Sequence, residues 1–154
     1  MNKQTLPHQR AALVGNGLDI GHWRRAIVAG NRVHAAGDTD SARRAYLYAL
    51  SLAQGLLSHG EDADEAVAAL VVTHHNLADL YLASRRAELA ADHLCAVHRQ
   101  LLTLADGGAP ALLAAARMHL RRTRMELLRF LAEHGSHAHV EATLALPFPA
   151  AWLH

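Results

Sequence analysis

The chain has 154 residues, enough for one domain with a sizeable core, and 51% of them are hydrophobic although only 5% are aromatic. Fifteen basic and fourteen acidic residues give a net charge of +1, which argues against nucleic acid or an anionic membrane surface as a partner. The single cysteine, Cys95, excludes an internal disulfide and suits a reducing compartment, so we expect a cytoplasmic protein.

Residues 1–17 read as an N-terminal arm that contains Pro7, Gly15 and Gly17. The Gly-x-Gly string lacks the preceding strand and the third glycine of a dinucleotide-binding loop, so we do not interpret it as a phosphate site. No long apolar run occurs in this segment, and we expect neither a signal peptide nor a transmembrane helix. Residues 18–146 are expected to form one helical domain, and residues 147–154 an apolar tail.

Alanine and leucine dominate the domain, which predicts an all-α fold without a β-sheet. Glycine, proline and acidic N-cap residues divide it into five main helices and one short C-terminal segment. The joints are expected at Gly37 to Asp40, Gly60 to Asp62, Ser84 to Arg86 and Asp106 to Pro110. The predicted helices cover about residues 18–36, 40–58, 62–84, 87–105 and 111–134, and the short segment covers residues 140–146.

Two stretches of the chain fall into register when one is shifted by 48 residues. The shared pattern is a pair of small or apolar residues in one helix, a turn, then Ala, a large residue four positions later and a small residue three after that. The matching positions are Ala29, Gly30, Val33, Gly37, Ala42, Tyr46 and Ala49 with Leu77, Ala78, Tyr81, Arg85, Ala90, Leu94 and Val97. This pattern resembles the tetratricopeptide repeat (TPR), a pair of antiparallel helices packed through small residues.

The resemblance implies antiparallel helical hairpins stacked as a short right-handed TPR-like superhelix. The usual repeat has 34 residues, so the longer shift implies roughly 14 extra residues, which we expect between Leu56 and Val67 in a longer second helix and a longer connection. Because such repeats bind peptides or helices of other proteins in a concave groove, the resemblance implies a non-catalytic adaptor or chaperone-like module. The sequence shows no catalytic triad, P-loop or cofactor motif, and we expect neither a cofactor nor an enzymatic activity.

The resemblance also indicates which side chains face the groove. The first helices of the two pairs and the long helix over residues 111–134 would line it. Asparagines beside arginines resemble the members of the family that hold a peptide carboxylate, which fits the paired hydrogen bonds of guanidinium groups. In the alternative reading, the arginines of residues 117–129 form the solvated back of that helix. The candidate peptide-binding residues are Arg24, Asn31, His34, His75, Asn76, Asp79, Arg117, Arg121 and Arg124.

Thirteen histidines raise the question of a metal site. His75 and Asp79 share one helical face, but two ligands do not make a site. Three potential ligands gather only at His134, His137 and His139, beside two glutamates, and there we expect adventitious metal binding at most. A groove that holds His34, His75 and Asp79 leaves a proton-linked change in affinity as an alternative.

The tail concentrates apolar residues, including Phe148 and Trp152. We expect it to cap the last helices of its own domain; in the alternative reading it enters the groove of a second copy and forms a homodimer. The leading hypothesis for the whole chain is a protein-protein interaction module. The alternatives are a homo-oligomeric structural subunit assembled through apolar helical faces, and a helical enzyme or small-ligand-binding domain.

Overall fold

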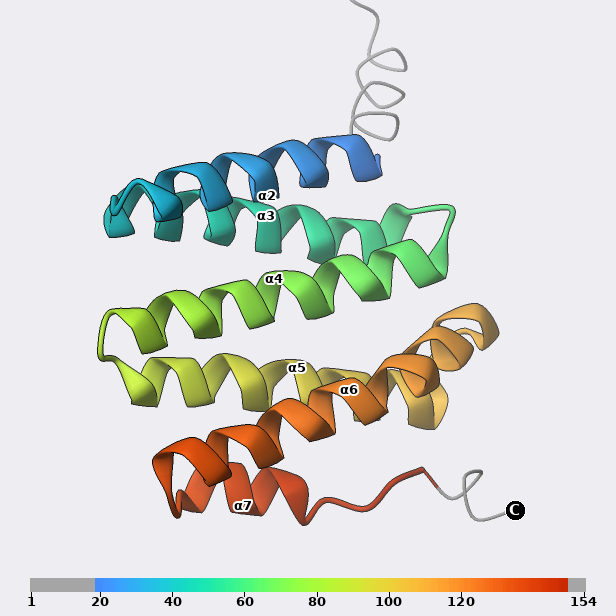
Figure 1. Ribbon diagram of the computed structural model, residues 1–154. Helices are drawn as coiled ribbons and strands as arrows, with labels where there is room; N and C mark the ends of the chain where they lie inside the picture. Colours follow the sequence, from blue (N-terminus) through green and yellow to red (C-terminus); the bar gives the residue numbers. More distant parts are fainter. Residues whose placement is uncertain (1–18, 150–154) are drawn as a thin grey trace, which may run out of the picture.

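The computed structural model describes residues 19–149, and over this range the chain forms six α-helices and no β-strand (Figure 1). The prediction of an all-α fold is therefore confirmed. The N-terminal arm lies outside the described residues. The helices are α2 (Ile20–Ala35), α3 (Thr39–His59), α4 (Ala63–Ala83), α5 (Ala87–Gly107), α6 (Pro110–His134) and α7 (Ala138–Leu144).

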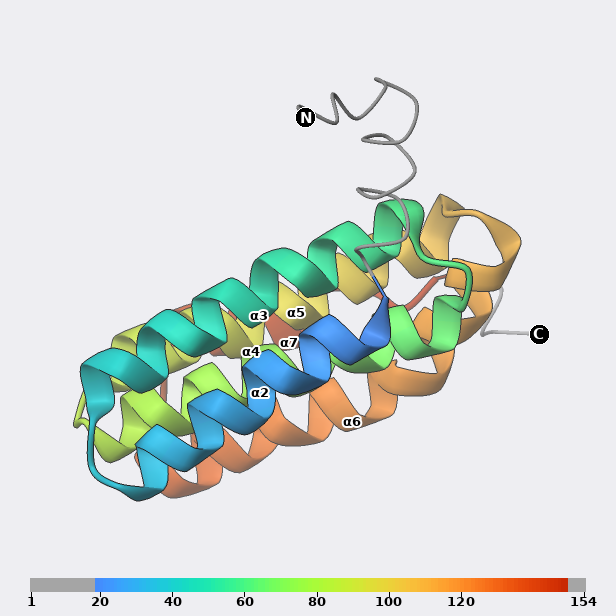
Figure 2. The ribbon, with the colours of Figure 1, turned by 90° about the horizontal axis from the view of Figure 1, so that it is seen from above.

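Each helix packs against the next one along the chain, and the helices lie in two layers (Figures 1 and 2). Helices α2, α4 and α6 form one layer, in which α4 contacts both of its neighbours. Helices α3, α5 and α7 form the other layer. Helix α4 is the centre of the packing, because most of its side chains are buried between the helices around it.

Acidic side chains fix the beginnings of three helices. The carboxylates of Asp19, Asp38 and Asp62 each accept a hydrogen bond from the backbone N–H three residues further on, at 3.0 to 3.1 Å. These bonds satisfy backbone donors that have no partner within the helix. Helix α6 begins differently, with Pro110 in its first turn, where the missing N–H removes nothing from the helix. The predicted joints agree with the observed helix boundaries to within about two residues.

The two helix pairs turn through the same backbone conformation at positions 48 residues apart. Gly37 follows α2 with φ 83°, and Arg85 follows α4 with φ 59°. At both joints the next residue returns a hydrogen bond to the helix, from Asp38 N to Val33 O and from Arg86 N to Tyr81 O. The shift seen in the sequence therefore corresponds to two structurally equivalent helical hairpins.

The extra residues between the two pairs lie in longer helices. Helices α3, α4 and α5 each have 21 residues, and only residues 60–62 connect α3 to α4. The predicted longer connection between Leu56 and Val67 is therefore wrong. Leu56 and Val67 are both buried in helices, so additional helical turns that bury apolar side chains have taken the place of a loop.

The described part of the tail folds back on its own domain. Phe148 packs against the apolar cluster that contains Leu101 and Leu120, and the Arg124 guanidinium lies 5.7 Å from the centre of its ring. Pro149 is buried. Up to this point the tail lies against the C-terminal part of α5 and the middle of α6, as expected of a segment that covers its own domain. Trp152 lies outside the described residues.

Candidate functional site

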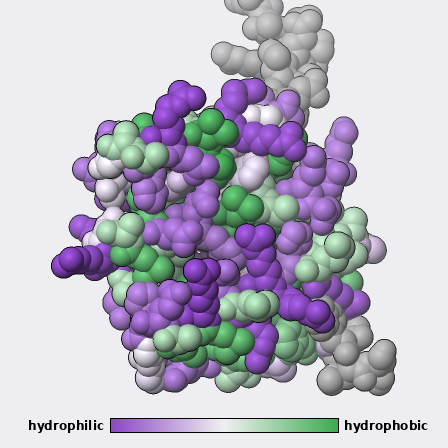
Figure 3. All heavy atoms as spheres, in the orientation of Figure 1, coloured by the Kyte–Doolittle hydropathy of each residue, from purple (hydrophilic) through white to green (hydrophobic). Residues whose placement is uncertain are grey.

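A polar concavity lies between α4 and α6, in the layer that faces the viewer in Figures 1 and 3. Its volume is about 260 Å³. Hydrophilic side chains cover much of the middle of this face, with isolated hydrophobic ones among them (Figure 3). We call this hollow the α4/α6 groove. Helix α4 contributes the side chains of Val72, His75, Asn76, Asp79 and Leu82, and α6 contributes those of Arg122, Glu126, Arg129, Phe130 and Glu133.

His75 is the most deeply placed polar side chain of the groove. It is only 8% exposed, and its Nε2 atom has no hydrogen-bond partner among residues 19–149. Burial, together with the nearby charge of Arg122, lowers the pKa of His75 to about 4. The imidazole is therefore neutral at physiological pH. A buried polar atom without a partner is unfavourable, so this nitrogen is available to a ligand that supplies the missing hydrogen bond.

Asn76 connects the groove to the first helix pair. Its side-chain amide donates a 3.5 Å hydrogen bond to the Oδ1 atom of Asn31, and the hydroxyl of Tyr46 donates a second bond to the same oxygen at 2.6 Å. Asn31 is exposed on α2. The Asn31 carbonyl thus accepts from α3 and α4 at once, which fixes its orientation beside the groove.

Asp79 carries an unpaired carboxylate in the groove. Within the described range it makes neither a hydrogen bond nor an ion pair. Although the residue as a whole is exposed, the walls of the groove take its carboxyl group partly out of water. This desolvation raises the pKa of Asp79, while the charges of Arg129 and His34 act to lower it and that of Glu133 acts to raise it.

Helix α6 presents alternating charges to the groove at spacings of three and four residues. The Arg129 guanidinium lies 3.0 Å from Glu133 and 4.0 Å from Glu126. The hydrogen bond and charge of Glu133 raise the pKa of Arg129. Because Arg129 is held by carboxylates of its own helix, it does not form an ion pair with Asp79. Arg122 makes no ion pair with any other described residue.

The structure places the three predicted arginines of α6 away from this groove. Arg117, Arg121 and Arg124 lie outside the groove: Arg124 covers Phe148, Arg121 is exposed, and the Nε atom of Arg117 is buried without a hydrogen-bond partner in the described chain. The physical reason is the rotation of α6. Its core stripe of Ala116, Leu120, Thr123, Leu127 and Phe130 packs on the other helices, and the stripe places residues 122 and 129 beside α4.

The remaining candidates lie around the groove. Arg24 is on α2 and approaches Glu65 of α4 at 3.8 Å, in a largely exposed ion pair. His34 lines a separate hollow with Thr39, Asp40 and Arg43, although its charge still acts on Asp79. The structure thus brings His75, Asn76 and Asp79 together, with Asn31 and His34 near them.

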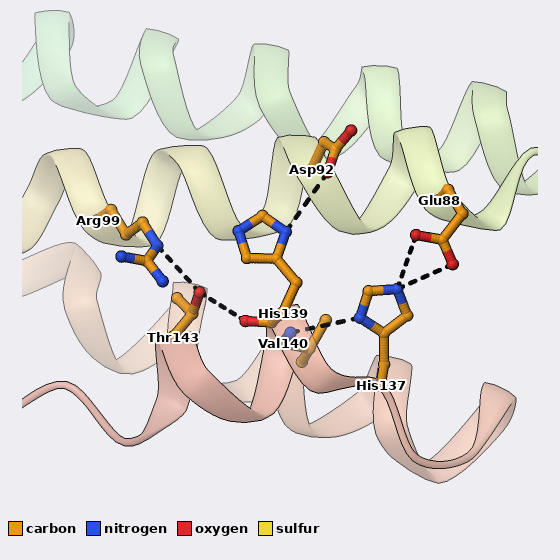
Figure 4. Close-up of polar contacts among 7 residues, drawn as sticks. All are labelled: Glu88, Asp92, Arg99, His137, His139, Val140 and Thr143. Atoms are coloured by element: carbon orange, nitrogen blue, oxygen red, sulfur yellow. Dashed lines mark hydrogen bonds and ion pairs between the residues drawn. The ribbon is translucent and has the colours of Figure 1, made fainter.

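Sequence reasoning missed the contacts between α5 and α7. His137 Nε2 lies 3.1 Å from both carboxylate oxygens of Glu88, and His139 Nδ1 lies 3.4 Å from Asp92 (Figure 4). These two histidines were grouped with His134 as potential metal ligands. Instead they point to separate carboxylates, and residues 19–149 contain no group of three or more side chains placed to hold a metal ion.

Two further findings concern the whole described chain. Cys95 is fully buried, and burial raises the pKa of its thiol, as is typical of an unreactive core cysteine. Within residues 19–149, none of the helices combines the length and the apolar character that crossing a bilayer requires.

A family model described as "Protein of unknown function (DUF2753)" matches residues 21–146. No curated protein and no solved structure matches the chain. The matched residues include all six described helices except the first residue of α2, so the hairpins and the groove both lie within the family region.

Proposed function

The chain belongs to the family of proteins of unknown function DUF2753, and we propose that it is a non-catalytic interaction module of TPR-like architecture. In this proposal the layer of α2, α4 and α6 binds an extended peptide or a helix of another protein. The equivalent hairpins at Gly37 and Arg85 support the TPR-like reading. We place the protein in the cytoplasm, because its one cysteine suits a reducing compartment.

One observation carries this proposal: the α4/α6 groove contains hydrogen-bonding groups that the protein itself does not use. His75 Nε2 is buried without a partner, and Asp79 and Arg122 have no ion pair among the described residues. Polar groups of this kind form new bonds when a partner excludes water from them. Since other charged side chains of the groove are already paired, the unused groups mark the place where a partner would contact this face.

The charges of the groove limit which partners fit. Arg122 remains as the unpaired guanidinium that could hold a peptide carboxylate, in place of Arg117, Arg121 and Arg124. Three carboxylates and two guanidinium groups line the groove, so it attracts neither a polyanion nor an anionic membrane. We therefore propose a protein or peptide partner of mixed charge.

Site-specific photo-cross-linking in the native cells tests the proposed function. Met125 is 63% exposed and lies one turn before Arg129 on α6, so a photoreactive residue there reports on the groove side. Tyr48 is 58% exposed on α3, in the other layer, and provides the control position. We expect one discrete adduct with another protein from position 125 and none from position 48. Equal adducts from both positions, or none from either, would contradict the proposal.

A second candidate function is self-association through the exposed apolar side chains of α6 beside the groove. Met118, Met125 and Leu128 are 75%, 63% and 45% exposed, which is unusual for large apolar side chains on one helix. Met118 and Met125 are seven residues apart and therefore share a side of α6. If this face joins two copies, light scattering gives the mass of a dimer, and the paired substitutions Met118→Lys and Met125→Lys return it to that of a monomer.

A further inference from the structure

The unpaired acceptors of the α4/α6 groove indicate the chemistry of the group that it binds. Asp79 offers two carboxylate oxygens that accept no hydrogen bond from any described residue. The Asn76 side chain uses its N–H₂ group toward Asn31, which leaves its carbonyl oxygen as an acceptor. One turn before Asp79 on the same face, the buried Nε2 atom of His75 lacks a partner. A neutral imidazole nitrogen accepts a hydrogen bond when its proton is on the other nitrogen.

The charged groups of α6, on the opposite wall of the groove, do not donate hydrogen bonds to these acceptors. The guanidinium of Arg129 is held at 3.0 Å by Glu133 and lies near Glu126, so it forms no ion pair with Asp79. The charge of Arg122 acts on His75, whereas the charges that act to lower the pKa of Asp79 are those of Arg129 and His34. The Asp79 end of the groove therefore has carboxylates in excess.

The walls and the size of the groove match a long side chain with a cationic end. Val72, Ala78, Leu82, Leu94 and Phe130 supply apolar surface around the polar groups. The volume of about 260 Å³ is below the range of roughly 300 to 1,000 Å³ that is typical of sites for small molecules and cofactors. A space of this size takes one side chain and not a whole ligand. Lysine and arginine have methylene stems that pack on apolar walls while their charged ends remain hydrogen-bonded.

We propose that the α4/α6 groove binds a lysine or arginine side chain of the partner, with the Asp79 carboxylate as its ion-pair partner and with Asn76 Oδ1 and His75 Nε2 as further acceptors. This inference rests on the proposed function, because it names the side chain through which the partner is recognised. An ammonium group has three donors, which matches the number of acceptor groups at this end of the groove.

A peptide array tests the inference with defined probes. The probes are acetylated and amidated nonapeptides in which one position at a time is fixed as Lys, Arg, Glu or norleucine and the other positions are randomised. Norleucine keeps the apolar stem of lysine without its charge. For the wild-type protein we expect selection of Lys or Arg at one position over norleucine. The variant D79N should lose that selection by roughly tenfold, because the ion pair is removed while the shape is kept.

Two further variants make the result specific. Glu61 is exposed before α4 and does not line the groove, so E61Q changes the net charge as D79N does and should leave the selection unchanged. The reversal D79R should select Glu at the position where the wild type selects Lys. Circular dichroism of each variant establishes that it is folded.

The possible failures are distinguishable. If peptides bind in a manner that depends on His75 and Arg122 but select Glu or norleucine, the inference of a basic side chain is overturned while the proposed function stands. If no fixed residue is selected and no peptide binds, both are overturned. If E61Q loses the selection to the same extent as D79N, the effect is one of overall charge and the assignment to Asp79 is wrong.

Discussion

Tyr46 on α3 packs directly against Gly30 on α2, so closely that a Cβ atom at position 30 would overlap the tyrosine ring. From this position the Tyr46 hydroxyl donates a 2.6 Å hydrogen bond to Asn31, which also accepts a bond from Asn76. Because Gly30 has no side chain, the Tyr46 ring can lie directly against the backbone of α2. The same contact that holds α2 to α3 also orients the asparagine beside the α4/α6 groove.

Substitution of Gly30 tests this packing. We expect Gly30→Ala to destabilise the protein by about 1 to 3 kcal/mol, because the added methyl group meets a buried ring that has no space to move. The measurement is the free energy of unfolding in urea. Gly107→Ala is the matched control: a Cβ atom there has nothing within 4 Å, and the substitution should leave stability unchanged or raise it slightly. Equal changes in the free energy of unfolding for both substitutions would contradict the proposed close packing of Gly30 and Tyr46.

The left-handed conformation of Arg85 gives a second prediction. Residues with a side chain adopt positive φ at a cost of about 1 kcal/mol or more, whereas glycine does not. Arg85→Gly should therefore stabilise the protein by roughly 0.5 to 1 kcal/mol, despite the greater freedom of glycine in the unfolded chain. Arg86, whose φ is −114°, is the control. Arg86→Gly should be neutral or destabilising, and thermal unfolding of the three proteins gives the comparison.

Buried histidines predict that the protein loses stability in acid. Burial lowers the pKa of His74 to about 3 and the pKa values of His75 and His98 each to about 4, from an ordinary value of 6.5. Below pH 6.5 the unfolded chain therefore binds more protons than the folded chain. Stability is complete above pH 6.5 and falls as the pH decreases toward 4, by at most about 1.4 kcal/mol per pH unit for each histidine.

Urea unfolding between pH 7.5 and 4.5 measures this slope. His98 is 1% exposed, and its Nδ1 atom lies 2.8 Å from Thr123. His98→Gln removes the titrating group but keeps a hydrogen-bonding side chain. The free energy of unfolding should therefore change less with pH, by the contribution of one histidine. The variant His59→Gln, at an exposed position, is measured in parallel as the control for the loss of one histidine. A stability that is constant over this pH range would contradict the prediction.

The docking of α7 depends more on His137 than on His139. The side chain of His137 accepts a bond from the Val140 N–H at the start of α7 and also meets Glu88, whereas the side chain of His139 meets only Asp92, from a more exposed position (Figure 4). His137→Ala should thus lower the local stability of α7 by about 1 kcal/mol, the typical effect of losing an N-cap. His139→Ala should have a smaller effect, as expected of an exposed ion pair. Hydrogen exchange of the α7 amides distinguishes the two.

Much of the fold could be predicted because its boundaries are encoded locally. Asp38, Gly60 and Pro110 act within one or two turns of their own position, so the sequence alone locates the joints. The equivalence of Gly37 and Arg85 was visible as a shift of 48 residues, even though arginine is an unusual residue at positive φ. Local signals also explain why the side of α4 with His75, Asn76 and Asp79 was identified.

The groove wall on α6 could not be chosen from sequence in the same way. Arginines occur on several sides of this helix, and only the packing of its core stripe places Arg122 and Arg129 beside α4 while Arg124 covers Phe148. The pairing of His137 with Glu88 joins residues 49 positions apart and has no local signature. Contacts of this kind depend on the relative rotation of helices, which periodicity does not determine.

The central claim is that the layer of α2, α4 and α6 binds another protein, and amide hydrogen exchange with and without a bound peptide tests it most directly. The probe is the nonapeptide that binds most tightly on the array. The account predicts slower exchange in residues 72–82 of α4 and 122–133 of α6, with little change in α3 and α5. Protection concentrated in α3 and α5, with α4 and α6 unaffected, would contradict it.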